Sequence, residues 1–118
     1  MTGAMAARVD LDDCHVVGVT REDHCVVVEL EQRRNKSKER IVVRAADVSE
    51  EVAEYYVGER VTAPHPDPTL PLDYIEYAEQ GPGYLEFQGY LRNESWFVWR
   101  IVAPNIEIRK GNHGSTAT

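Results

Sequence analysis

Residues 83–109 read GYLEFQGYLRNESWFVWRIVAPNIEIR and contain both tryptophans, both phenylalanines and two of the six tyrosines of the chain. Apolar and polar side chains alternate from Tyr84 to Leu91, and a polar segment, 92–95, separates this run from the apolar run 96–102. Alternation with a period of two is typical of a half-buried strand, and a short polar segment between two such runs indicates a turn. The stretch therefore predicts a β-hairpin and a following strand, around which the rest of the chain packs.

The two faces of this hairpin are predicted to differ. A two-residue loop and a four-residue loop both place Leu91 opposite Trp96, and residues opposite each other share a face of the sheet. One face then carries core residues together with Arg100. The other face carries the candidate binding residues Glu86, Gln88, Tyr90, Phe97 and Trp99. A register slip of one residue would exchange the faces, and a face covered by other elements is the alternative to a binding role.

The remaining sequence predicts further strands and one helix. Strands are expected at 11–20, 25–31, 41–45, 59–63, 72–78 and 106–109. Asp47 and Glu50 have the spacing of a capping box and Gly58 suits the position after a helix, so 47–58 is predicted to be helical. Four prolines within 64–71 predict an extended connection, with a recognition segment as the alternative.

These elements favour a mainly β fold. We expect an antiparallel β-sandwich or a partly open barrel of about seven or eight short strands with one short helix. An α+β arrangement, with one curved sheet and a helix, is the alternative. The length of 118 residues predicts a single domain, 1–118, with flexible tails at 1–9 and 110–118.

The apolar runs are short. None approaches the ~20 residues of a membrane helix. Residues 4–7 are also too few for the apolar region of a signal peptide, and no basic residue precedes them. The sequence therefore predicts a cytoplasmic protein without a membrane partner.

The formal charge of −7 is unevenly distributed along the chain. Five basic residues and Glu39 give the segment 33–40 a charge of +4, which leaves −11 for the remainder. An acidic body disfavours general nucleic-acid binding and favours a basic protein partner. The basic segment is either a solvated hairpin loop or a docking site for phosphate or an acidic protein.

Catalytic and metal-binding motifs are sparse. Cys14-His15 and His24-Cys25 do not have the spacing of a zinc knuckle, and a turn between them would hold the pairs roughly 15–20 Å apart. Phosphate-loop, nucleophile-elbow and dinucleotide-binding patterns do not occur. Glu76, Glu79 and Glu86 could approach each other across strands. We predict no catalytic residue, metal or cofactor, and an enzyme is not favoured.

The segment 11–32 resembles the opening of a group of small bacterial β proteins. It combines Leu11-Asp12-Asp13-Cys14, the apolar run 16–20, an acidic turn and the alternating run 26–31. Proteins of this kind begin Leu-His-Asp-Ser or Leu-His-Asp-Cys; several are uncharacterised, and some are similar to immunity proteins that neutralise a cognate polymorphic toxin. Here Asp12 replaces the histidine. The resemblance covers about a fifth of the chain and implies an immunity-like function without any catalytic residue.

The leading hypothesis is a non-enzymatic interaction domain, immunity-like, that binds a basic protein through the candidate binding face. The alternative is a β-barrel that binds a small ligand, or a weak hydrolase, with Glu86, Gln88 and Tyr90 pointing into a pocket. Nucleic-acid contact through 33–40 is a third hypothesis. The run 96–102 is apolar on both faces, so a homodimer seam is a further one.

Overall fold

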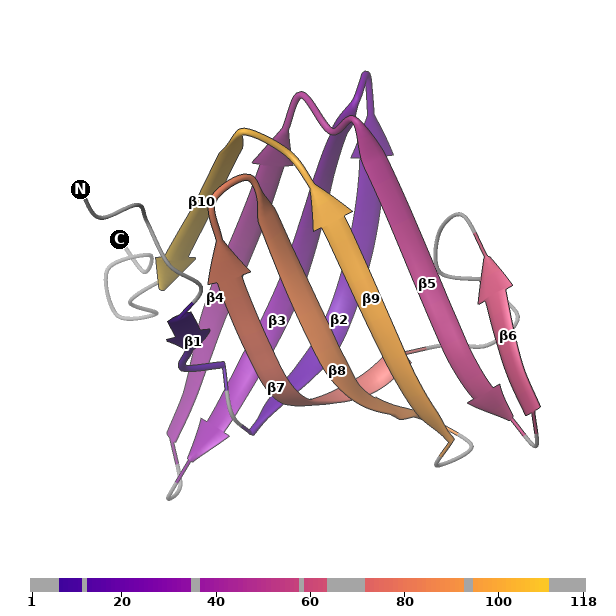
Figure 1. Ribbon diagram of the computed structural model, residues 1–118. Coiled ribbons are helices and arrows are strands. Elements are labelled where there is room, and N and C mark those ends of the chain that lie inside the picture. The colour runs from indigo at the N-terminus through magenta and orange to yellow at the C-terminus, as the bar shows by residue number, and fades with distance from the viewer. Residues whose placement is uncertain are drawn as a thin grey trace.

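The computed structural model describes residues 7–11, 13–34, 37–57, 59–63, 72–92 and 95–110. These residues form ten strands and no helix, which confirms the prediction of a mainly β protein (Figure 1). The strands are β1 (Ala7–Val9), β2 (Cys14–Glu22), β3 (Cys25–Arg34), β4 (Ser37–Ala46), β5 (Glu50–Val57), β6 (Glu59–Ala63), β7 (Leu72–Gly81), β8 (Tyr84–Leu91), β9 (Trp96–Val102) and β10 (Asn105–Lys110). The described part of the chain has no helix that could cross a membrane.

All strands belong to one antiparallel sheet with the order β10-β4-β3-β2-β7-β8-β9-β5-β6. β1, predicted as part of the N-terminal tail, instead pairs with β7. The rest of the predicted tails, 1–6 and 111–118, and the whole of the proline-rich segment 64–71 lie outside the described residues. Within the described chain the hydrogen-bonded path has two ends, β10 and β6, so the sheet is continuous and open.

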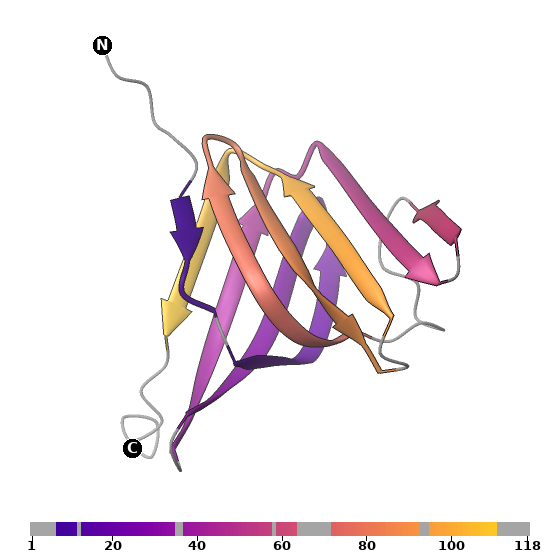
Figure 2. The same cartoon turned by 60° about the horizontal axis from the view of Figure 1, so that its bottom comes forward.

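The sheet bends sharply where β2 meets β7. Only two residue pairs, Cys14 with Ile75 and His15 with Tyr74, join these strands. Figures 1 and 2 show the consequence, because β2, β3 and β4 lie behind β7, β8 and β9 and the two groups of strands face each other. One sheet therefore provides two layers and a space between them.

Apolar side chains from both layers fill this space. Leu30 and Ile41 from one layer and Phe87 and Trp99 from the other are fully buried. The buried apolar residues form one cluster that reaches from β2 to β9. Burial of this continuous apolar surface is the main source of stability for such a fold.

The prediction of a helix at 47–58 is wrong. Residues Glu50–Val57 form β5, which pairs with β9 along seven residue pairs and with β6 along five. Ala53 and Tyr55 are buried in the core. Asp47 has a φ of 60° and so does not begin a helix. A helix cap stabilises by only about 1 kcal/mol, whereas β5 satisfies the backbone of β9 and buries two core residues.

Candidate functional site

The register of the β8–β9 hairpin differs by one residue from the predicted register. Tyr90, rather than Leu91, lies opposite Trp96. The Leu91 N–H donates to the Ser95 carbonyl at 2.8 Å, so three residues, 92–94, stand between the bonded pair. The predicted loops had two or four residues. Because each residue added or removed inverts the faces, one residue of difference exchanges the inner and outer sides of β9.

The five predicted binding residues therefore do not share a face, and that part of the prediction is wrong. Glu86, Gln88 and Tyr90 point outward, whereas Phe97 and Trp99 lie in the core with no exposed surface. The observed register also keeps Arg100 exposed instead of placing it opposite Phe87 in the core. Burial of an unpaired guanidinium costs several kcal/mol, which decides between two registers with similar backbone hydrogen bonding.

Burial also contradicts the inward pocket of the alternative hypothesis. The space between the layers is filled by apolar side chains, and Glu86, Gln88 and Tyr90 lie on the opposite side of the sheet. A cavity of about 280 Å³ opens instead beside the β2–β3 turn, where Arg21 and Glu51 are among the lining residues. Glu51 accepts from the buried Trp99 indole Nε1–H at 2.7 Å and pairs with Arg21, which satisfies the polar atom of the largest core side chain.

The outward side of β7, β8, β9 and β5, called the outer face below, carries a row of aromatic residues in register. Tyr74 lies opposite Tyr90, Tyr90 opposite Trp96, and Trp96 opposite Tyr56. The rings of Tyr90 and Trp96 meet edge to face with centroids 5.1 Å apart. Tyr56 and Tyr90 are each 40% exposed. This aromatic row crosses four strands near their ends, and a group of large rings that are partly exposed on a surface is typical of an interaction site.

Only Tyr90 of this row was among the predicted site residues. Tyr56 was placed on the predicted helix, and Trp96 was placed on the core face by the incorrect register. Tyr74 lies two strands away from Trp96, so its position depends on the pairing of β7 with β8. The aromatic composition of the segments was visible in the sequence, but the row is created by strand order.

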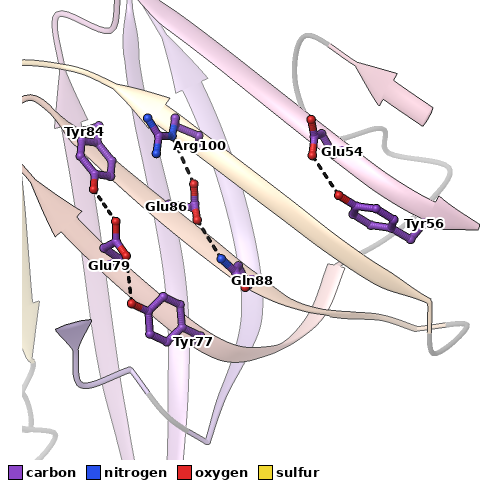
Figure 3. A network of polar contacts seen from close by, with 8 residues as sticks. All are labelled: Glu54, Tyr56, Tyr77, Glu79, Tyr84, Glu86, Gln88 and Arg100. Carbon is purple, nitrogen blue, oxygen red and sulfur yellow. Dashed lines mark hydrogen bonds and ion pairs between the residues drawn. The ribbon is translucent and has the colours of Figure 1, made fainter. Parts of the chain in front are cut away.

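A carboxylate bound by two phenols lies further along the outer face (Figure 3). The Tyr77 hydroxyl donates to Glu79 Oε1 at 2.9 Å, and the Tyr84 hydroxyl donates to Glu79 Oε2. Hydrogen bonding from Tyr84 and then from Tyr77 lowers the pKa of Glu79 below its ordinary value. The same bonds, supported by desolvation, raise the pKa of each phenol. Glu79 is therefore ionised at neutral pH.

A second carboxylate lies directly across from the first. Glu86 is the Cα partner of Glu79 on β8. Its oxygens accept from Gln88 Nε2 at 2.8 Å and from Arg100 Nε at 3.2 Å, as Figure 3 shows. The Arg100 guanidinium also lies over the Tyr84 ring, 4.2 Å from its centroid. The two facing carboxylates repel each other, and the hydrogen bonds from Tyr77, Tyr84 and Arg100 offset this repulsion.

The other candidate groups are dispersed. Cys14 pairs with Gln32 and Cys25 with Glu22, so the two cysteine–histidine pairs lie at opposite ends of the β2–β3 hairpin. Glu76 is exposed and does not join Glu79 and Glu86. Across the described ranges, no three His, Cys, Asp or Glu side chains are arranged to hold a metal ion.

The basic segment at the β3–β4 turn is partly neutralised where it is described. Arg33 donates to Glu31 at 2.7 Å, and this bond lowers the pKa of the Glu31 carboxyl. Arg40 Nη1 lies 3.7 Å from Glu29 Oε1. Residues 35–36 are outside the described ranges. The outer face, with its aromatic row and two adjacent carboxylates, is the stronger candidate site.

Comparisons with known proteins add no assignment to this geometry. No protein-family model, curated protein or solved structure matches the chain.

Proposed function

We propose that the protein is a non-enzymatic interaction domain that binds a basic protein partner through its outer face. The aromatic row carries this proposal. Its residues lie opposite one another on four neighbouring strands. Tyr56 and Tyr90 are each 40% exposed, whereas other aromatic residues of the chain are buried in the core. Tyrosine and tryptophan are the residue types that contribute most to binding energy at protein interfaces.

The charge of the outer face supports a basic partner. Glu54, Glu79 and Glu86 lie on this face. Besides the hydrogen bonds from the two phenols, Arg100 also lowers the pKa of the Glu79 carboxyl, and it donates to Glu86. The chain as a whole has a formal charge of −7, so long-range attraction also favours a basic protein. The aromatic side chains supply contact area for tight binding, and the carboxylates attract a basic partner towards this face.

The resemblance of segment 11–32 to immunity-like proteins supports one specific form of this proposal. An immunity protein binds its toxin without chemistry, which fits a surface rich in aromatic and acidic groups. The partner would then be a basic toxin domain, and neutralisation would result from coverage of the toxin by the outer face.

The experiment is capture of the partner from the native host with tagged wild-type protein and with a Tyr56→Ser/Tyr90→Ser double variant. Both tyrosines are exposed, so the double variant is expected to remain folded. Loss of two interface tyrosines should weaken partner binding at least about tenfold, measured with the purified partner by calorimetry. Val17→Ser is the matched control, because Val17 is 50% exposed and lies on β2, a strand that contributes no residue to the aromatic row.

A stoichiometric partner that the wild type and Val17→Ser retain, and that the double variant loses, would support the proposal. Equal retention by the double variant would place the interface elsewhere and contradict it. A wild-type protein that retains no stoichiometric partner would contradict the interaction function itself.

A further inference from the structure

Two arginines of the chain lie over tyrosine rings of the outer face. Arg100 lies 4.2 Å from the Tyr84 ring centroid while its Nε donates to Glu86. Arg8 lies 5.4 Å from the Tyr77 ring centroid, and the Tyr77 hydroxyl donates to Glu79. In both cases a planar cation lies over a tyrosine ring whose hydroxyl donates to a carboxylate.

The end of the outer face on β5 and β9 repeats this combination. The Tyr56 hydroxyl donates to Glu54 Oε1 at 3.1 Å, so a tyrosine and a glutamate two residues apart on one strand are joined, as Tyr77 and Glu79 are on β7. Trp96 lies opposite Tyr56 and adds a second ring. Arg60 is the Cα partner of Tyr56 on β6, and its side chain is not among the described ones. Among the side chains that the structure describes, no arginine or lysine lies over the ring of Tyr56 or of Trp96.

We infer that Tyr56, Trp96 and Glu54 form a site for an arginine side chain of the partner. The inference rests on the proposed function, since it names the group that the outer face recognises. Arginine is favoured over lysine because a guanidinium is planar, stacks on aromatic rings and is weakly hydrated, whereas an ammonium retains its water. Tryptophan is the best of the aromatic rings for such a contact.

The test uses two peptides of equal charge and length, acetyl-(Gly-Arg)₄-amide and acetyl-(Gly-Lys)₄-amide, titrated into the protein by nuclear magnetic resonance. The two indole N–H signals make the readout specific. Trp96 lies on the outer face, whereas Trp99 is fully buried with its N–H bonded to Glu51. We expect the arginine peptide to shift the Trp96 signal and to bind roughly two- to fivefold more tightly than the lysine peptide.

Two variants separate this site from general attraction by an acidic protein. Glu54→Gln should abolish the preference for arginine. Glu107→Gln removes the same charge from β10, where Glu107 is exposed and paired with Arg109, and should leave the preference unchanged. The isosteric substitutions change no core residue, so both variants are expected to fold.

Equal affinity for the two peptides, or binding of the arginine peptide without a shift of the Trp96 signal, would overturn the inference. Either result would leave the proposed interaction function intact, because that function is judged by loss of the whole partner from the tyrosine double variant. An arginine preference that Glu54→Gln retains and Glu107→Gln removes would also overturn it.

Discussion

Substitution of Gly89 by alanine is expected to destabilise the protein strongly, although it adds only one methyl group. Gly89 lies two residues before the end of β8, opposite Ile75 on β7 and Phe97 on β9. β7 is irregular on both sides of this point, with register shifts between Leu72 and Tyr74 and between Ile75 and Tyr77. The irregularity brings the β7 backbone close to the position that a side chain at residue 89 would occupy.

The size of the effect follows from the distances. A Cβ at residue 89 would lie 1.9 Å from the Tyr74 carbonyl oxygen and 3.0 Å from the Ile75 Cα. These are backbone atoms, so relief requires movement of β7 and of Ile75, which is fully buried. Overpacking of a core typically costs about 1–3 kcal/mol and occasionally more, and we expect a loss of about 3 kcal/mol here. A loss of this size is a large fraction of the roughly 5–15 kcal/mol that stabilises a domain.

Urea unfolding followed by circular dichroism measures this loss. With a denaturant slope of about 1–3 kcal/mol per M, the midpoint should fall by roughly 1–3 M. Gly18→Ala is the matched control, because a Cβ at residue 18 has Glu29 Oε1 as its nearest neighbour at 3.9 Å. This control should change stability by less than about 1 kcal/mol and in the stabilising direction. A Gly89→Ala protein as stable as the Gly18→Ala protein, with an unchanged slope, would refute the register and the irregularity of β7.

Two further predictions concern the polar contacts. Glu51→Ala removes the acceptor of the buried Trp99 N–H and should cost about 1–3 kcal/mol in urea unfolding, whereas Glu51→Gln retains an acceptor oxygen and should cost less; equal losses would contradict this role. The Glu79 carboxyl should titrate below its ordinary pKa of 4.5 by nuclear magnetic resonance, because Tyr84 and Tyr77 donate to its charged form. The stability that it contributes is therefore present above pH 4.5 and is lost as the pH falls through the lowered pKa; a midpoint at or above 4.5, or the same acid dependence in Glu79→Gln, would contradict the network.

The strands that carry the aromatic row could be predicted from local pattern alone. The alternation from Tyr84 to Leu91 and the apolar run from Trp96 to Val102 correspond to β8 and β9 with the predicted bounds. Such patterns are reliable because a half-buried strand needs an apolar residue at every second position. The outward orientation of Glu86, Gln88 and Tyr90 relative to Leu85 and Phe87 was predictable for the same reason.

The candidate site as a whole was not predictable in this way. Tyr56 comes from a segment whose spacing also fits a helix, and it reaches the outer face because β5 supplies the missing partner of β9. The intrinsic preferences of this segment for a helix and for a strand differ little in free energy, so its pairing with β9 decided the outcome.

The sequence by itself determined that the chain forms antiparallel strands with one apolar side, because hydrophobic periodicity is a local property of each segment. The tertiary structure decided which side of β9 is buried. The run from Trp96 to Val102 is apolar at both sets of alternate positions, so its pattern contains no preference, and one residue in the loop exchanges the sides. Trp99 is in the core and Trp96 is on the outer face because this arrangement keeps the Arg100 side chain exposed and paired with Glu86, instead of burying it opposite Phe87.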